Sequence, residues 1–280
     1  SQIRPAGAYL KSSGGKAPGP EPLKKALNNI RKILDKALKD GQRKLNPVQA
    51  YDIVMHTADA VISGGVRRSA TICVFSPDDT AMATAKTGTW FIDNPQRGRS
   101  NNSALLLRDE TTKEQFSELM KSVKEFGEPG FVWSDSTELL VNPCVEIGMW
   151  PVCEKTKESG WQACNLSTIN CAKIKTEQDF FDACRAATII GTLQAGFSEF
   201  PYLGNTSERI IEREALLGVS MTGIMERHDI CLDPTCQKRG AEIVRRTNKK
   251  IASMLGINQA ARTTCIKPEG TSSCVLGTSS

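Results

Sequence analysis

Apolar residues recur every three or four positions in several stretches of the chain, which is the spacing that lines one face of an α-helix. The clearest stretch covers residues 22–40, where leucine and isoleucine alternate with lysine-rich polar positions. Asn46, Thr112 and Thr176 are suitable N-caps for later helices. The pattern predicts helices over residues 22–40, 47–63, 113–126, 177–197, 207–217 and 234–255.

Short apolar runs rich in β-branched and aromatic residues lie between these helices and indicate buried β-strands. The predicted strands cover residues 70–75, 103–107, 131–133, 163–169 and 263–267. Strands that alternate with helices are typical of an α/β protein. No internal repeat is visible, and 280 residues are enough for one large domain or two small ones.

The composition is that of an ordinary globular protein, with 39% hydrophobic and 24% charged residues. No apolar run reaches the roughly 18 residues that a membrane-spanning helix needs, and the first residues lack the pattern of a secretory signal. We therefore expect a cytoplasmic protein with no membrane partner. The net charge of +5 suits a phosphate-bearing substrate but does not by itself indicate a direct nucleic-acid partner.

The ten cysteines are spread along the chain without a Cys-x-x-Cys pair, and only two histidines accompany them. This spacing disfavours a zinc site, so the sequence predicts no metal ligands. A disulfide framework is disfavoured as well, because the chain carries no secretory signal. A reducing compartment with a few functional thiols is the better interpretation.

Asn142, Cys144 and Glu146 occupy alternating positions in a loop region. If this segment is extended, an amide, a thiol and a carboxylate point the same way. A nearby carboxylate raises the pKa of a thiol, which disfavours a thiolate nucleophile. The same pair suits a neutral thiol that loses a hydrogen atom beside a separate base. On residue chemistry alone, an ordinary buried cysteine remains the alternative.

Several segments resemble, in the same order along the chain, the catalytic subunit of ribonucleotide reductases. Residues 142–147, Asn-Pro-Cys-Val-Glu-Ile, resemble the active-site finger loop of that family. The proline in this loop is similar to that of the adenosylcobalamin-dependent (class II) enzymes. The other segments that carry the resemblance are residues 4–7, 11–15, 63–70, 101–103, 164–170 and 268–273.

The resemblance implies a role for each residue of the finger loop. Cys144 would hold a thiyl radical and abstract the 3′ hydrogen of the ribose. Glu146 would take the proton of the 3′-hydroxyl as a general base, and Asn142 would orient the ribose hydroxyls. Cys164 would be one of two cysteines that reduce the 2′ carbon and end as a disulfide, with Cys153 as the alternative for this role.

The resemblance also implies a loop that binds the substrate phosphates. Gly270 permits close backbone approach, the neighbouring hydroxyls and amides form a plausible anion nest, and Lys267 adds charge. Without the resemblance, these residues read equally well as a plain turn. The substrate-binding residues implied are Pro268, Glu269, Gly270, Thr271, Ser272 and Ser273.

The family fold is a ten-stranded α/β barrel around the finger loop, and its chains are longer than this one. The resemblance therefore implies that residues 1–280 are the central segment of a single barrel domain, incomplete at both ends. The second redox cysteine would lie upstream of Ser1 and the remaining strands downstream of Ser280, supplied by other polypeptide segments.

The family's chemistry implies further partners. These are a ribonucleotide substrate, a nucleotide effector and a thioredoxin-like reductant. Adenosylcobalamin would be the radical source, with a radical from a separate diiron subunit as the alternative. Two other interpretations stay open at this point: a thiol-redox or metal-binding protein, and a non-catalytic nucleotide-binding segment.

Overall fold

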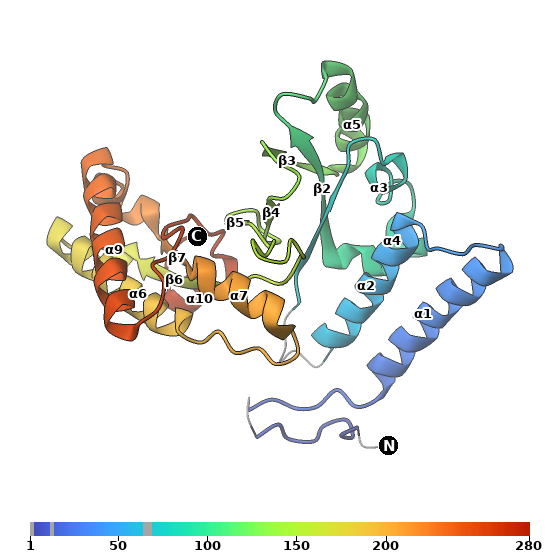
Figure 1. The fold of residues 1–280 in the computed structure, drawn as a ribbon, viewed down its shortest axis with the longest axis horizontal. Helices are drawn as coiled ribbons and strands as arrows, with labels where there is room; N and C mark the ends of the chain where they lie inside the picture. Colours follow the sequence, from blue (N-terminus) through green and yellow to red (C-terminus); the bar gives the residue numbers. More distant parts are fainter. Residues whose placement is uncertain (1–2, 12–13, 64–68) are drawn as a thin grey trace. The chain divides into compact units, whose positions relative to one another are not determined.

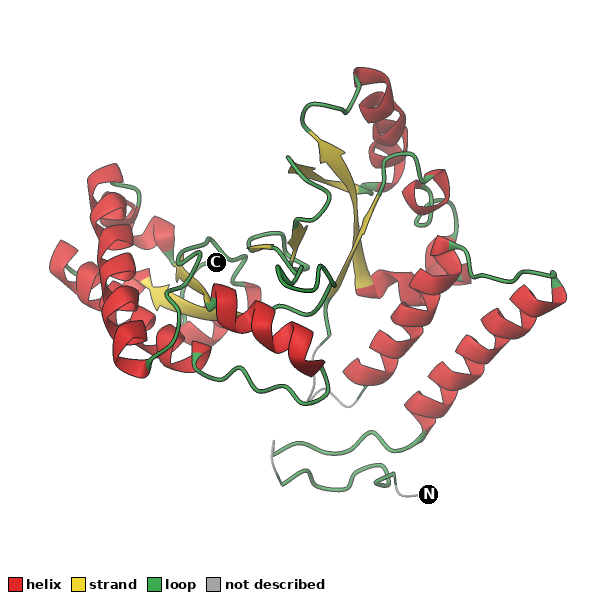
Figure 2. Ribbon diagram, viewed as in Figure 1, coloured by secondary structure: helices red, strands yellow, loops and turns green. Residues whose placement is uncertain are grey.

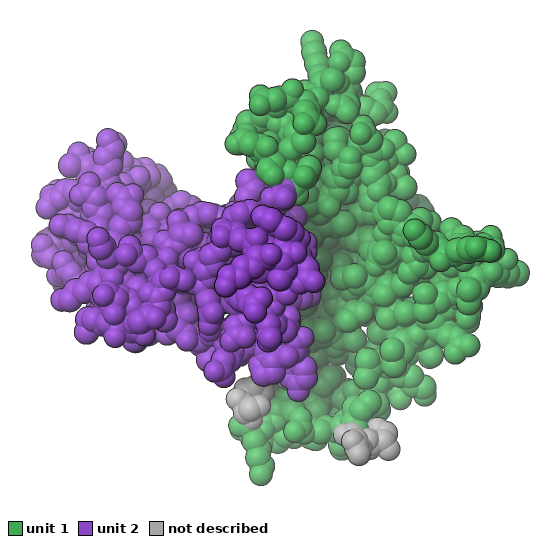
Figure 3. Space-filling view, in the orientation of Figure 1, with its two compact units in different colours: residues 1–137 green, residues 138–280 purple. Residues whose placement is uncertain are grey.

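The structure, a computed structural model, describes residues 3–11, 14–63 and 69–280. It divides into two compact units, residues 1–137 and 138–280, which Figure 3 draws in separate colours. Each unit combines helices with its own strands (Figure 2), so the predicted α/β class is confirmed. Two of the segments that carry the family resemblance are only partly described. Residues 64–68 of the segment 63–70 and residues 12 and 13 of the segment 11–15 lie outside the described residues.

The first unit is built on a parallel sheet with the strand order β1-β2-β3. Its helices begin where the capping residues predict. Asn46 accepts a hydrogen bond from the Gln49 amide, and Thr112 accepts one from the Gln115 amide, each in a capping box. The elements are α1 (Glu21–Lys39), α2 (Pro47–Ile62), β1 (Thr71–Phe75), α3 (Thr80–Ala83), α4 (Trp90–Asp93), η1 (Pro95–Arg99), β2 (Ser100–Leu107), α5 (Lys113–Phe126) and β3 (Gly130–Ser134).

The second unit holds an antiparallel hairpin, β4-β5, and a parallel pair, β6-β7 (Figure 1). Thr176 caps the long helix that follows β6, as predicted. The elements are β4 (Leu140–Val141), β5 (Gly148–Met149), β6 (Cys164–Asn170), η2 (Cys171–Lys173), α6 (Glu177–Ala195), α7 (Gly204–Glu214), β7 (Leu216–Thr222), η3 (Ile224–Arg227), α8 (His228–Cys231), α9 (Pro234–Leu255) and α10 (Gly270–Leu276).

The prediction of a helix over residues 207–217 is wrong at its C-terminal end. The helix ends at Glu214, and Ala215 adopts a left-handed conformation with φ of 40°. Residues 216–222 then form β7, a strand that the sequence pattern missed. Six of its seven residues are buried, so both faces are covered and no period-two alternation marks the strand.

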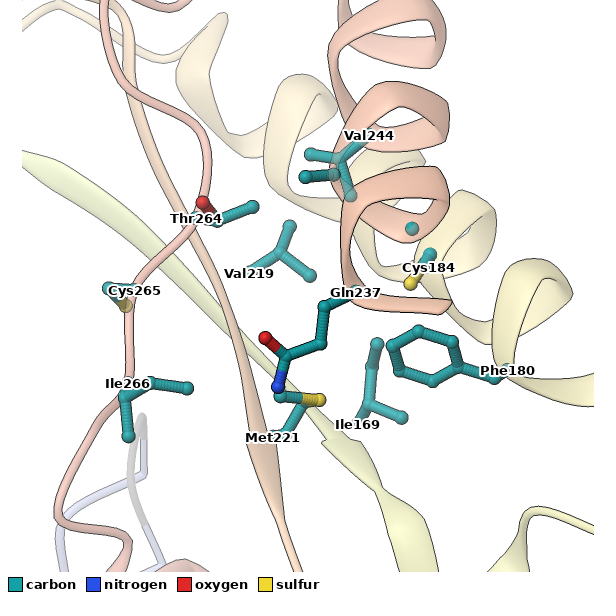
Figure 4. Close-up of a pocket in the computed structure, with 12 residues that line it drawn as sticks. Ile169, Phe180, Cys184, Val219, Met221, Gln237, Val244, Thr264, Cys265 and Ile266 are labelled. Carbon is teal, nitrogen blue, oxygen red and sulfur yellow. The ribbon is translucent and has the colours of Figure 1, made fainter. Parts of the chain in front are cut away.

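The parallel pair β6-β7 has two different faces. On one face, Ile169 and Val219 join the apolar core with Phe180 of α6 and Val244 of α9. A cavity of about 310 Å³ lies on this side, and Thr264 points into it beside β7 (Figure 4). We call this side the helix face.

The opposite face carries Cys164, Leu166 and Thr168 of β6, which alternate with the residues of the helix face. Residues 263–265 extend this sheet beyond β7, where Val219 pairs with Thr264 in a parallel bridge. The strand predicted over residues 263–267 is therefore present only as this short pairing. We call this second side the loop face, because the hairpin β4-β5 lies against it.

Among the described residues, no helix is both long and apolar enough to cross a lipid bilayer.

Candidate active site

The finger loop is the connection of the hairpin β4-β5, in which Val141 pairs with Gly148. Residues 142–147 therefore form a closed loop and not the extended segment that the alternating side chains suggested. The Val145 amide donates to the Asn142 carbonyl at 2.9 Å, which closes a β-turn with Pro143 and Cys144 at its centre. Proline at the second position of such a turn has its φ already set, so the local sequence favours this geometry.

The turn places the Cys144 thiol at the exposed tip of the loop. Val145 follows it with φ of 67°, which is a strained conformation for a β-branched residue. Strain of this kind persists only where the surroundings impose it and is concentrated at functional sites. The pKa of Cys144 is raised, by partial burial first and by the Glu146 charge second, so the thiol is neutral at pH 7.

The Asn142 side chain has a structural task in this loop. Its Oδ1 accepts a hydrogen bond from the Ile147 amide at 3.0 Å. Only the oxygen of the carboxamide can accept from an N–H group, so the contact fixes the orientation of the amide. The NH₂ group is then the part of Asn142 that can donate to a ribose hydroxyl.

Glu146 acts electrostatically on three thiols at once. Its charge raises the pKa of Cys144, of Cys164 and of Cys265. Burial is the larger cause for each, and it raises the pKa of Cys164 to about 12 and of Cys265 to about 11. Glu146 Oε2 is buried and has no hydrogen-bond partner among the described residues. An unpaired buried acceptor beside neutral thiols is a suitable base for a substrate hydroxyl.

The loop is held on the sheet by packing at one glycine. A Cβ atom at Gly218 would lie 2.4 Å from Leu166 Cδ2, 2.9 Å from Cys265 Sγ and 3.3 Å from Ile147 Cδ1. The absence of a side chain in β7 thus leaves room for the buried Ile147 of the finger loop. Arg262 adds a polar tether, because its Nε donates to the Gly148 carbonyl at 3.0 Å.

Cys164 and Cys153, the two residues considered for the reducing role, lie in different surroundings. Cys164 is on the loop face of β6, within the influence of Glu146, Arg262 and Cys265. Cys153 is buried in a separate hairpin, where hydrogen bonds from Thr156 lower its pKa. Of these two cysteines, Cys164 is the one that lies near the finger loop.

The residues of the implied phosphate loop divide between a short extended segment and a helix. Pro268 and Glu269 precede α10, and Gly270 to Ser273 form its first turn, so the alternative of a plain turn is wrong for this part. The Ser273 amide is already bonded to the Glu269 carbonyl at 2.8 Å. Glu269 itself points inward, with 1% of its side chain exposed.

The sequence pattern did not single out Cys265 and gave Lys267 only a minor role on the loop face. Cys265 carries a thiol next to Glu146, and Lys267 forms an ion pair with Glu269 at 3.0 Å. The signal was available in the alternation of residues 263–267. Thr264 points into the cavity of the helix face, which Cys265 also borders. The Cys265 thiol approaches Gly218, and Lys267 contacts Thr168 on the loop face.

A radical cofactor needs from the protein a hydrogen-atom donor that remains neutral, and Cys144 meets that requirement. Its exposure at the turn also leaves the sulfur accessible. The residues of the loop therefore fit the chemistry of an adenosylcobalamin radical generator. Each of the ten cysteines is a free thiol, and the described residues contain no group of three or more His, Cys, Asp or Glu able to hold a metal ion.

The fold is shared with ribonucleotide reductases. A crystal structure of a B12-dependent (class II) ribonucleotide reductase matches 99% of this chain and 42% of its own, with a TM-score of 0.73 and 23% identity. The class Id α subunit of Actinobacillus ureae matches 83% of this chain with a TM-score of 0.53 and 12% identity. No family model matches the chain.

Sequence relatives narrow the resemblance to one type of reductase. The adenosylcobalamin-dependent ribonucleoside-triphosphate reductase of Lactobacillus delbrueckii is 26% identical over 324 aligned positions, covering 100% of this chain and 41% of the relative. That of Euglena gracilis is 26% identical and covers 99% of this chain. The predicted resemblance to a segment of this enzyme type is confirmed. The chain spans about two fifths of the length of the relatives it matches.

Proposed function

We propose that this chain is the finger-loop segment of an adenosylcobalamin-dependent ribonucleoside-triphosphate reductase, which reduces ribonucleotides to 2′-deoxyribonucleotides. The observation that carries the proposal is the arrangement around Glu146. A neutral thiol at an exposed turn and a second neutral thiol on the sheet lie near a buried carboxylate oxygen that has no hydrogen-bond partner in the described part of the chain. The relatives that bear this name provide independent support.

The chemistry assigned to the chain's own residues is balanced. Cys144, as a thiyl radical, takes the 3′ hydrogen atom, while Glu146 Oε2 accepts the proton of the 3′-hydroxyl. Cys164 and a second cysteine supply two electrons and two protons and become a disulfide, so that the 2′-hydroxyl leaves as water and the 2′ carbon gains a hydrogen. Glu146 returns its proton to the 3′ oxygen. Cys144 then returns its hydrogen atom to the 3′ carbon. Bound adenosylcobalamin supplies the organic radical that oxidises Cys144 in the first place.

The same proposal assigns the rest of the barrel, the reductant and the effector of the complete enzyme. The complete protein is a ten-stranded α/β barrel, and other polypeptide segments supply the remaining strands and the second redox cysteine. A thioredoxin-like protein reduces the disulfide by thiol exchange, and a nucleotide effector acts elsewhere on the protein. A reducing, cytoplasmic location suits the ten free thiols.

The test is nucleotide reduction by the assembled protein. The chain is combined with the segments that complete the barrel, adenosylcobalamin, a dithiol reductant and a ribonucleoside triphosphate, and 2′-deoxynucleotide is measured by chromatography. Cys144→Ala is expected to lower turnover by more than about a thousandfold, because no other thiol lies at the turn. Cys73→Ala in β1 is the matched control. Turnover that survives in Cys144→Ala would exclude the proposal.

A further inference from the structure

The strand that leaves the finger loop uses its two edges differently. The Ile147 carbonyl accepts a hydrogen bond from the Asn142 amide at 3.3 Å. The Pro151 carbonyl accepts one from the Gly160 amide at 2.8 Å. Successive carbonyls of a strand point to opposite edges, so residues 147 and 151 mark one edge and residues 148, 150 and 152 mark the other.

Two arginines occupy this second edge. Arg262 Nε donates to the Gly148 carbonyl at 3.0 Å. Arg213 Nη2 donates to the Trp150 carbonyl at 2.8 Å, and its Nη1 donates to the Val152 carbonyl at 2.6 Å. The two guanidinium groups thus bind the backbone acceptors that a neighbouring strand would otherwise bind.

Glu214 joins the two arginines. Its Oε1 accepts a hydrogen bond from Arg213 Nη2 at 3.0 Å, and its Oε2 lies 3.5 Å from Arg262 Nη2. The Glu214 side chain is 7% exposed, whereas those of Arg213 and Arg262 are 22% and 44% exposed. One buried carboxylate is therefore shared by two cations. We call Arg213, Glu214 and Arg262 the arginine clamp.

The backbone on which the clamp stands is fixed by β7. Glu214 is the last residue of α7, and its carbonyl accepts a hydrogen bond from the Ala261 amide at 2.8 Å. The Arg262 carbonyl accepts one from the Leu217 amide of β7 at 3.1 Å. The carboxylate and Arg262 are thus anchored to the sheet from two distant parts of the chain.

The clamp reaches both strands of the finger hairpin. The Arg213 Cζ atom lies over the Trp150 ring, 4.6 Å from its centre. The Trp150 Nε1 donates to Glu138 Oε2 at 3.0 Å, just before β4. Because β4 and β5 lead directly into the finger loop, the position of the two strands sets the position of Cys144 at its tip.

We propose that Glu214 is a positioning residue for the finger loop, which it holds through Arg213 and Arg262. This inference rests on the proposed function, since it names the group that places the reacting thiol of that site. Without the carboxylate, the two guanidinium groups repel each other and the hairpin loses its fixed edge. A displacement of about 1 Å at a reacting group costs about a hundredfold in rate, so a tether of this kind matters for turnover.

The first test measures how fast iodoacetamide alkylates Cys144. The chain, combined with the segments that complete the barrel, is treated without cofactor, substrate or reductant, and the modified peptide is quantified by mass spectrometry at several pH values. In Glu214→Gln we expect alkylation at pH 7 to be at least about threefold faster and its pH midpoint to fall. The thiol then leaves the partial burial and the Glu146 charge that raise its pKa. Glu212→Gln, at an exposed position of the same helix, is the matched control.

The second test separates positioning from substrate binding. In Glu214→Gln the kcat for nucleotide reduction should fall at least about tenfold, while KM for the ribonucleoside triphosphate stays within about threefold of the parent. The expected split arises because the clamp contacts the hairpin and not the substrate. Glu212→Gln should keep both values.

Arg262→Met tests whether Glu214 acts through the arginines. Arg262 is the more exposed partner, so its replacement removes the bond to Gly148 and leaves the core intact. Its effect on alkylation should have the same direction as that of Glu214→Gln and be smaller, because Arg213 remains. In the double variant the two effects should not multiply, since both remove the same tether.

Three outcomes would overturn the inference. They are parent-like alkylation of Cys144 in Glu214→Gln, an unchanged kcat in that variant, and effects of Glu214→Gln and Arg262→Met that multiply independently. If circular dichroism shows that Glu214→Gln does not fold, Arg262→Met decides alone, and parent-like alkylation there overturns the inference. Alkylation needs no turnover, so its result does not depend on whether Cys144 is the radical site.

Discussion

The two faces of the β6-β7 sheet differ in whether their buried polar atoms have hydrogen-bond partners. The helix face is an apolar core in which Ile169, Val219 and Val244 are all buried. The loop face carries thiols, a lysine and two carboxylates, and both Glu146 and Glu269 have a buried oxygen that lacks a hydrogen-bond partner among the residues that the structure describes. The same pair of strands thus carries an apolar core on one side. On the other side it carries reactive side chains whose hydrogen-bonding capacity is not fully used.

Cysteine shows the difference most directly, because the same residue type occurs on both faces. Cys184 and Cys231 are part of the apolar core of the second unit. Cys164 and Cys265 lie near Glu146 on the loop face. Burial raises the pKa of Cys184 to about 12 as well, so thiol acidity does not distinguish the two classes. What distinguishes them is the neighbouring carboxylate and access to the finger loop.

The largest effect is expected when a cysteine is removed from the loop face. Cys164→Ala should lower multiple-turnover reduction by more than about a hundredfold, since the substrate then lacks one of its two reducing thiols. Cys184→Ala on the helix side should retain most of the activity. Deoxynucleotide formed per folded molecule is the measurement. If Cys153→Ala is inactive while Cys164→Ala is active, the assignment of the reducing thiol is wrong.

The second effect concerns stability and the helix face. Leu217 is 1% exposed and packs against the space at Gly191. Leu217→Ala should lower the free energy of unfolding by about 2–5 kcal/mol, because it leaves a cavity in the core. Leu193→Ala on α6 is the control, since that side chain is 55% exposed. Denaturant unfolding of the two variants should differ clearly, and equal midpoints would contradict the assignment of Leu217 to a packed face.

A third, smaller effect is expected at the glycine under the finger loop. Gly218→Ala places a methyl group 2.4 Å from Leu166 Cδ2 and 2.9 Å from Cys265 Sγ, so these side chains must shift, and Ile147 of the finger loop, at 3.3 Å, must give way slightly. We expect a loss of about 1–3 kcal/mol in stability and about tenfold to a hundredfold in kcat, because the thiol moves away from the sheet. Gly148→Ala, which meets no atom within 4 Å, is the control for stability. Unchanged kcat in Gly218→Ala would show that the loop does not need this contact.

The smallest effect is a pH dependence of stability at Glu269. Its pKa is depressed in the folded state from the ordinary value of 4.5, so its contribution to stability is fully present above pH 4.5. That contribution is lost as the pH falls through the folded pKa. The difference in unfolding midpoint between the parent and Glu269→Gln should therefore shrink on acidification. Glu242→Gln, at an exposed position of α9, removes a carboxylate elsewhere and is the control. A difference that grows on acidification would contradict the sign.

Local sequence signals determined much of this molecule. The capping boxes at Asn46, Thr112 and Thr176 set three helix starts correctly, because a cap depends only on residues within one turn. The charge of Glu146 beside Cys144 was equally legible, since charge proximity acts over a few residues. The turn at Pro143 was not predicted, because the alternating side chains suggested an extended segment. The order of the similar segments was enough to indicate the reductase family.

Tertiary structure decided what depends on contacts between distant segments. The strand β7 has no alternation to reveal it, because helices cover one face and the finger loop covers the other. The same holds for the joining of Lys267 with Thr168, which are separated by 99 positions and meet only across the sheet. Sequence thus specified the Cys144 thiol, the Glu146 carboxylate beside it and the helices around them. Packing across β6 and β7 decided which thiols and which cation face the loop.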